Sequence, residues 1–245
     1  MKKRMNAKIN YWIGYAKFVG EFFAFRDRSR KSGREFVPRW SERRALLNYK
    51  TPDTKVDRHY VFHTAWAARV LAQTRPVYHV DISSTLYFGA MVSAFVPIKF
   101  YDYRPAQMDL KGLECGKEDL LHLSFPDSTV ASISCMHTLE HVGLGRYGDT
   151  MDPNGDINGI NEIKRVTKKG GDILCVVPVG KPNIIFNAHR IYSYEQIIKY
   201  FDGCELKEFA LIPDDAKDGN LVYGATKEMV AQQTYGCGCF WFKKK

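Results

Sequence analysis

Residues 118–142 read EDLLHLSFPDSTVASISCMHTLEHV and residues 161–178 read NEIKRVTKKGGDILCVVP, and these two stretches decide the fold. Each contains a run of apolar and small residues, Val130 to Met136 in the first and Asp172 to Val177 in the second. We expect both runs to be buried strands, the second entered through two glycines and stopped by Pro178.

A helix is expected between the two strands. Ile160 and Ile163 recur at helical spacing, and the segment ends in a basic turn at Lys164, which suits the negative end of a helix dipole. A strand, a helix and a strand in this order imply a parallel crossover. The sequence therefore predicts an α/β protein.

The same stretches resemble the class I S-adenosylmethionine-dependent methyltransferases of the ubiquinone-biosynthesis type. That family has an acidic residue, then LPF, a strand followed by LEH, and E..RVLKPGG before the next strand. The matching residues here are Asp119, Leu123-Ser124-Phe125-Pro126-Asp127, Leu139-Glu140-His141, Glu162, Arg165-Val166, Lys168 and Gly170-Gly171. Ala131 stands where the family usually has aspartate, and Lys169 replaces the proline of KPGG. The resemblance implies a Rossmann-like fold, with a mostly parallel seven-stranded sheet, an antiparallel C-terminal hairpin, and S-adenosylmethionine as cofactor.

Two further segments resemble one branch of this superfamily. They are VGLGRYGDTMDPNGD after His141 and VGKPNIIFNAHRIYS after Pro178. The branch is known only as a domain of unknown function, first noted in nematode sequences and often found in bacteria beside surface-polysaccharide genes. The resemblance runs from about Asp57 to the closing YGCGCFWFK. It implies O-methylation of a carbohydrate or a surface-glycan precursor.

Composition favours one domain over residues 57–245 with an extension over residues 1–56. The 245 residues are 45% hydrophobic, which is enough for one sizeable core. Most of the six cysteines lie singly in apolar runs, as reduced core cysteines of a cytoplasmic protein do. We expect no metal site, since the Cys237-Gly238-Cys239 pair lacks a second pair of ligands.

The extension carries the net charge of +9. Sixteen basic residues accompany six acidic ones up to Arg58, whereas the rest of the chain has 20 basic and 21 acidic residues. Within the extension, residues 9–25 are rich in aromatic side chains but too short and too charged to span a bilayer, and no signal-peptide cleavage site is clear. Two interpretations stay open: a helix that lies on an anionic membrane surface through residues 1–50, at the inner face, or a first helix packed on the domain. Nucleic acid is not an expected partner, because the remaining domain is nearly neutral.

A cofactor loop is expected after the strand Val77 to Ile82. The resemblance implies that Asp81 is its acidic residue and that Ser83 lies where the family has glycine, ahead of a helix from Leu86 to Val92. Glycine lets the backbone approach a ligand closely and take positive φ, which serine does less readily. The alternative of a non-catalytic domain that binds a glycosyltransferase or a membrane partner therefore stays open.

Four more residues are implied as cofactor contacts. Asp102 follows the strand Ile98 to Tyr101, where the family has an acidic residue that accepts hydrogen bonds from the ribose hydroxyls; alternatively it only opens a turn. Asp119 matches the aspartate near the adenine amino group, with Leu120 as its apolar neighbour. His137 would project at the same edge, because ligands of open parallel sheets lie beyond the carboxyl ends of the strands.

Candidate catalytic and substrate-binding residues follow the later strands. His141 and His189 are possible bases because the pKa of free histidine is near neutrality, and Glu140 accompanies them; Glu140 and His141 could equally fix the turn. Asn187 and Arg190 could contact the acceptor, with Arg190 holding a phosphate or carboxylate, or they could begin the next helix. Finally, Asp149 and Asp152 lie in an acidic loop that suits sugar hydroxyls, a hard cation or a plain turn.

The C-terminal part is expected to complete the sheet. A helix from Tyr194 to Phe201 precedes two strands, Glu205 to Ile212 and Gly236 to Phe242, which would form the antiparallel hairpin at the sheet edge. Residues 235–241 would cover the side of the active site, and the acidic residues 213–219 would form a loop.

Overall fold

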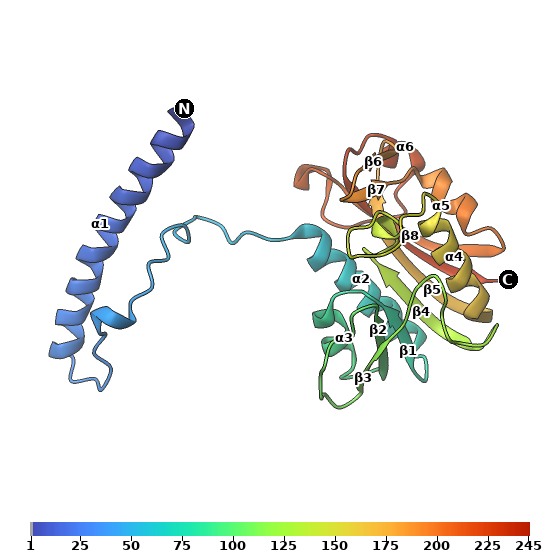
Figure 1. The fold of residues 1–245 in the computed structure, drawn as a ribbon, viewed down its shortest axis with the longest axis horizontal. Helices are drawn as coiled ribbons and strands as arrows, with labels where there is room; N and C mark the ends of the chain where they lie inside the picture. Colours follow the sequence, from blue (N-terminus) through green and yellow to red (C-terminus); the bar gives the residue numbers. More distant parts are fainter. Residues whose placement is uncertain (1) are drawn as a thin grey trace. The chain divides into compact units, whose positions relative to one another are not determined.

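The computed structural model describes residues 2–245, which divide into two compact units between Val56 and Asp57 (Figure 1). The first unit consists of a long helix, α1 (Lys2–Lys31), and a returning segment with one 3-10 turn, η1 (Trp40–Glu42). The Trp40 ring stacks on Phe23 with centroids 5.5 Å apart and meets the edge of Phe22 at 5.0 Å. These aromatic contacts hold the returning segment against the helix.

Several aromatic side chains of the first unit are exposed. Trp12 is 65% exposed and Phe25 is 63% exposed, and both lie on α1. Within residues 2–245, no helix is both long enough and apolar enough to cross a membrane. The segment Ile9 to Phe25 lies within α1 and is therefore helical. Its contact with a membrane surface stays a prediction.

The second unit is built on an eight-stranded sheet in the order β3-β2-β1-β4-β5-β10-β8-β9. The strands are β1 (His79–Ile82), β2 (Ile98–Asp102), β3 (Leu113–Lys117), β4 (Val130–Met136), β5 (Thr167–Val179), β8 (Cys204–Ile212), β9 (Val222–Tyr223) and β10 (Gly236–Lys244). Strands β3, β2, β1, β4 and β5 are parallel, and β10 is antiparallel to both β5 and β8. The two-residue β9 adds one strand to the seven expected.

Helices cover both faces of this sheet, as Figure 1 shows. They are α2 (Arg58–Thr74), α3 (Leu86–Val92), α4 (Gly155–Val166), α5 (Tyr194–Tyr200) and α6 (Lys227–Ala231). Along β5, Ile173 and Cys175 belong to the core cluster that contains residues of α4, α5 and α6, whereas Leu174 belongs to the cluster with α2 and α3. Successive side chains of a strand point to opposite faces, so a strand buried on both sides is apolar throughout.

The strands and the helix expected around the deciding stretches are present, with two differences. The expected strand Val130 to Met136 has these bounds, and it pairs with β5 in parallel. However, β5 begins earlier, at Thr167, and continues through Pro178 to Val179. Pairing with β4 ends at Val176, so no β4 residue needs the N–H that Pro178 lacks.

The last strands also differ from expectation in their place. The pair β8 and β10 is antiparallel as expected, but β10 lies inside the sheet and β9 forms the edge. A separate two-stranded hairpin, β6 (Asn183–Ile185) and β7 (His189–Ile191), follows β5. This hairpin presents the segment in which substrate contacts were expected.

Candidate functional site

The loop after β1 has the backbone conformation of a glycine loop although it contains serine. Ser83 has a φ of 56°, in the left-handed region, where a side chain costs roughly 1–2 kcal/mol. Its N–H donates to the Tyr101 carbonyl at 2.7 Å, and its carbonyl accepts from Thr138 Oγ1 at 3.0 Å. These contacts, from the ends of two neighbouring strands, hold Ser83 at positive φ, although serine takes this conformation less readily than glycine.

A cleft of about 240 Å³ lies at the carboxyl ends of the parallel strands. Five of the six residues predicted to bind a cofactor line it: Ser83, Asp102, Asp119, Leu120 and His137. Asp102 uses Oδ1 to accept the Arg104 N–H at 2.7 Å, and Asp119 uses Oδ1 to accept the Leu121 N–H at 2.9 Å. Each carboxylate therefore has a second oxygen with which to accept hydrogen bonds from a ligand.

Asp81, the sixth predicted contact, lies in the sheet and does not line the cleft. It is fully buried, and its Oδ1 accepts a hydrogen bond from the Ser134 hydroxyl at 2.6 Å. His79 bridges that hydroxyl and the Ser132 hydroxyl, so a buried polar chain links β1 to β4. Burial raises the pKa of Asp81 from 3.8 to about 7. The structure thus gives Asp81 a place in the support of the loop.

The polar cluster after β4 forms a short 3-10 turn, η2 (Leu139–His141). His137 Nδ1 lies 2.8 Å from Glu140 Oε1, and His141 Nε2 lies 3.8 Å from the same oxygen. Glu140 is only 1% exposed, so it cannot touch a substrate directly. Its contacts with the two imidazoles favour the alternative that Glu140 fixes the turn over a catalytic role.

His141 and His189 remain in positions suited to a base. His141 Nδ1 lies 2.6 Å from the Ala188 carbonyl, and the centroids of the His141 and His189 rings are 6.5 Å apart. Burial lowers the pKa of both rings below the usual 6.5. Both are therefore neutral near pH 7, the state in which an imidazole accepts a proton.

The acidic loop that follows η2 uses its aspartates internally. Asp149 accepts backbone N–H groups of Gly143 at 2.8 Å and Tyr147 at 3.1 Å. Burial alone would raise the pKa of Asp149, but these N–H donors outweigh it and lower the pKa. Asp152 accepts the Asn154 N–H and the Asn158 side-chain amide, both at 2.9 Å. The structure favours the plain-turn alternative for Asp152, while Asp149 also lines the cleft.

Arg190, on β7, contacts this loop, and its hydrogen-bond donors are not available to an acceptor. Its guanidinium is buried and donates to the carbonyls of Val142 at 2.6 Å, Pro153 at 3.3 Å and Asp152 at 3.4 Å. Its Nε lies 3.6 Å from Asp156 Oδ1. The expected contact with an anionic group of the substrate is thus contradicted, because the donors are occupied inside the protein.

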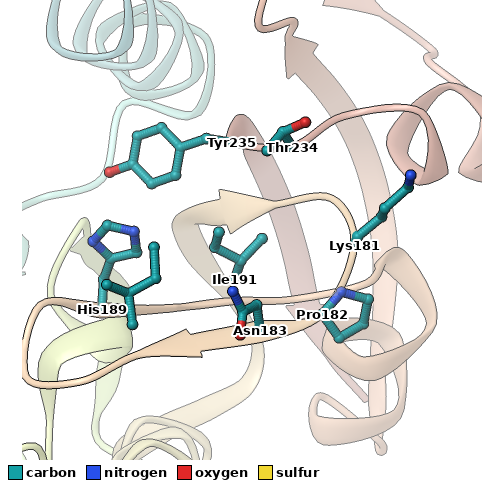
Figure 2. Close-up of a pocket in the computed structure, with 8 residues that line it drawn as sticks. Lys181, Pro182, Asn183, His189, Ile191, Thr234 and Tyr235 are labelled. Atoms are coloured by element: carbon teal, nitrogen blue, oxygen red, sulfur yellow. The ribbon is translucent and has the colours of Figure 1, made fainter.

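A second pocket of about 410 Å³ lies beside the hairpin (Figure 2). Its lining residues are Lys181, Pro182, Asn183, Ile185, His189, Ile191, Thr234 and Tyr235. Figure 2 shows Tyr235 facing His189 across one end, and their ring centroids are 4.8 Å apart. Asn187 is exposed at the tip of the hairpin and is not among the lining residues. The pair His141 and His189 connects this pocket to the cleft.

Two aromatic residues of the site were not assigned a role from the sequence. Tyr147 lines the cleft, and the guanidinium groups of Arg104 and Arg146 lie 4.9 and 5.1 Å from its ring centroid. Tyr235 stacks on His59 at 5.1 Å and meets the His189 ring at a tilted angle. For Tyr235, the sequence signal was the expectation that residues 235–241 cover the active site. For Tyr147, no feature of its loop sequence indicated an aromatic side chain at the cleft.

Comparison with known proteins agrees with this architecture. Residues 124–217 match the family model described as "Caenorhabditis protein of unknown function, DUF268". An uncharacterised protein of Methanocaldococcus jannaschii is 32% identical over 88 residues, which are 34% of this chain, so the chain spans about a third of that curated relative.

Among solved structures, a Galdieria sulphuraria protein described as a sarcosine dimethylglycine methyltransferase has a TM-score of 0.54 at 12% identity, covering 76% of this chain and 85% of its own. The Bradyrhizobium japonicum N-methyltransferase NodS, solved with S-adenosylhomocysteine, has a TM-score of 0.51 at 10% identity, covering 77% and 88%. A third structure is a chain from the Haloferax volcanii complex between the Trm112 methyltransferase activator and a protein described as a methyltransferase. It has a TM-score of 0.51 at 21% identity, and the match covers 76% of this chain and 90% of that chain. Residues 57–245 thus have the α/β Rossmann-like fold of class I methyltransferases, mostly parallel with antiparallel pairing at the C-terminus.

Proposed function

We propose that this protein is an S-adenosylmethionine-dependent methyltransferase that methylates a hydroxyl of a carbohydrate or surface-glycan precursor. The observation that carries the proposal is the cleft at the strand ends, whose lining includes Ser83, Asp102, Asp119 and Leu120. Ligands of open parallel sheets bind at this edge. These residues come from three separate segments, the ends of β1, β2 and β3, so their convergence is a property of the fold.

The cleft has donors and acceptors that fit the cofactor. Asp102 has an oxygen for vicinal ribose hydroxyls, and Leu120 offers an apolar surface beside Asp119 for a heterocycle. Ser83 holds the left-handed conformation that brings backbone close to a ligand. When bound, the cofactor supplies an activated methyl group on a sulfonium. The roles of this chain are then to position the acceptor, exclude water and take up a proton.

The second pocket is the proposed acceptor site. Lys181, Asn183 and Thr234 surround it with hydrogen-bonding side chains, and the Tyr235 ring offers a flat face for stacking a sugar. His189 is part of its wall, and its buried Nε2 has no hydrogen-bond partner within residues 2–245. We assign His189 as the group that accepts the hydroxyl proton and His141 as its support, since both rings are neutral near pH 7.

The choice of a glycan acceptor rests on the resemblance to a branch found beside surface-polysaccharide genes and on the hydrogen-bonding side chains of Lys181, Asn183 and Thr234 at the second pocket. The first unit adds a proposed partner. Exposed aromatic residues such as Trp12, on a chain segment rich in lysine and arginine, suit the surface of an anionic membrane. We accordingly propose a cytoplasmic protein that works at the inner face of a membrane.

A non-catalytic domain is the second candidate, and the size of the cleft favours it. At about 240 Å³ the cleft is smaller than the roughly 300–1,000 Å³ usual for ligand pockets. The Tyr147 ring between two guanidinium groups forms part of its wall. For methyl transfer, the loop that carries Tyr147 must therefore move when the cofactor enters.

Calorimetric titration of S-adenosylmethionine and S-adenosylhomocysteine into the full chain separates the two candidates. We expect micromolar binding that Asp102→Ala weakens at least tenfold, because a charged acceptor contributes about 1.5–3 kcal/mol. Asp109→Ala is the matched control, since Asp109 is exposed in the loop after β2 and does not line the cleft. Absence of binding to the folded protein would refute the methyltransferase and leave the non-catalytic domain. With binding established, methylation of nucleotide sugars and lipid-linked glycans tests the acceptor class.

A further inference from the structure

Three metal-ligating side chains converge from distant parts of the chain at His137, which also lines the cleft. His59 is in the first turn of α2, His137 follows β4, and Cys237 is in β10. One ligand atom from each lies within 4.8 Å of the other two. Cys237 Sγ lies 3.4 Å from His137 Nε2.

These separations are close to those of a tetrahedral zinc site. With Zn–S near 2.3 Å and Zn–N near 2.0–2.1 Å, tetrahedral ligand atoms lie about 3.5 Å apart. The contact between Cys237 and His137 already has this spacing. The other two separations are at most 4.8 Å and need to shorten by up to about 1.3 Å, which a side-chain adjustment of the half-buried His59 can supply.

The outer contacts of His137 are those of a metal ligand. Its Nδ1 lies 2.8 Å from Glu140 Oε1, so Nδ1 carries the proton and the Nε2 lone pair points to Cys237. Metal-bound imidazoles nearly always donate their second N–H to a carboxylate or carbonyl in this way. The second oxygen of Glu140 is buried without a hydrogen-bond partner among residues 2–245.

A cation at this place would also compensate the negative charge of the buried Glu140 carboxylate. The carboxylate is 1% exposed, and in the described chain its ion-pair partners are the imidazoles of His137 and His141, with no lysine or arginine among them. A buried carboxylate is costly unless a positive charge lies nearby. A divalent cation on the far side of His137 supplies that charge.

Two tyrosine rings and a further imidazole surround the proposed ligands. The Tyr60 ring stacks on His137 at 5.4 Å and the Tyr235 ring stacks on His59 at 5.1 Å. His63 meets the His137 ring at 5.0 Å, and its Nε2 is buried without a partner within the described residues.

We propose that His59, His137 and Cys237 form a binding site for a borderline-soft divalent cation of the Zn²⁺ type. Two imidazoles and one thiolate are ligands that such ions prefer over the oxygen-only sites of Mg²⁺ or Ca²⁺. Three protein ligands leave a fourth position for water or another small ligand. Binding replaces the Cys237 proton, which is released to solvent. The site does not depend on methyl transfer, since it requires only the folded chain.

Titration of Co²⁺ into the reduced, chelator-treated full chain tests the site. Cobalt takes the place of zinc in such sites and reports a thiolate ligand through a charge-transfer band in the near ultraviolet. We expect one Co²⁺ per chain with this band, and its loss on addition of one equivalent of Zn²⁺. Cys237→Ser should abolish the band, and Glu140→Gln should weaken metal binding about 10- to 100-fold.

Controls separate this site from adventitious binding. Cys115→Ser removes a half-buried thiol on β3, and His122→Gln removes an exposed imidazole; both should leave the titration unchanged. Since Cys237 is in the core, circular dichroism must first show that its variant is folded. If it is not, His59→Gln in the first turn of α2 carries the same test and should weaken binding at least tenfold. A titration without the charge-transfer band, or a band that persists in folded Cys237→Ser or disappears in Cys115→Ser, would overturn the proposal.

Discussion

Arg190→Ala is expected to destabilise the second unit strongly. Arg190 was a predicted substrate contact, yet the structure buries it between η2 and α4, where it is 4% exposed. Its guanidinium satisfies the carbonyl of Val142 at 2.6 Å and accompanies Asp156, which is also 4% exposed. Removal of one partner leaves the other charge buried and uncompensated.

The structure sets the magnitude of this loss. Breaking a buried ion pair by removing one side costs about 3–5 kcal/mol, and hydrogen bonds from a charged donor contribute about 1.5–3 kcal/mol within that sum. Asp156 keeps a hydrogen bond from the Tyr192 hydroxyl at 2.8 Å, so we expect the lower end, about 3 kcal/mol. For a unit of this size, that lowers Tm by roughly 6–12 °C.

Thermal unfolding followed by circular dichroism measures the effect. Arg69→Ala is the control, because Arg69 is exposed and its guanidinium bonds only the Ala65 carbonyl one turn away, so its loss should change stability by less than about 0.5 kcal/mol. Asp156→Asn in the Arg190→Ala background should regain stability, since a neutral amide is less costly to bury. A Tm within about 2 °C of the unmodified protein would refute the structural role.

Three further predictions address the loop after β1 and the first unit. Because burial raises the pKa of Asp81 from 3.8 to about 7, the folded state keeps a proton that the unfolded state has released, and stability falls as pH rises through that window. Asp81→Asn should lack this dependence between about pH 4 and 7 in Tm measurements, and parallel curves for both proteins would contradict it. Ser83→Val should lower the unfolding free energy, because a β-branched side chain is more strained than serine at a φ of 56°, whereas Ser83→Gly should not; equal urea midpoints would show that φ is unimportant. The full chain should sediment with anionic but not neutral lipid vesicles, less so at high salt or with Trp12→Ala, and binding indifferent to lipid charge would exclude the proposed electrostatic contact.

The sequence alone predicted the parts of the fold that depend on local pattern. The apolar run Val130 to Met136 became β4, and the run Leu86 to Val92 became α3, each with the expected bounds. Asp102 and Asp119 also line one cleft as expected, because the end of a parallel strand fixes where its next side chain lies. By contrast, β3 was not anticipated, since Glu114 and Gly116 interrupt any apolar pattern.

The roles of charged and metal-ligating residues depended on tertiary contacts that no spacing reveals. Arg190 is followed by an obvious helix start, but its partners come from the loop after η2. In the sequence, the candidate metal ligand beside Cys237 is its neighbour Cys239. The imidazoles that approach Cys237 in the structure are far from it in sequence, His59 near the start of the domain and His137 at the end of β4.

The place of β10 has a consequence for the synthesis of this protein. β10 is made after β5, β8 and β9, yet it lies between β5 and β8. Until residue 244 has left the ribosome, both neighbours present long unpaired edges, which are templates for aggregation. At roughly 5–20 residues per second the nascent chain carries these two edges for seconds, until β10 has been made and can pair with both. Chaperones that shield strand edges should therefore raise the yield of this protein more than that of folds whose last strand is peripheral.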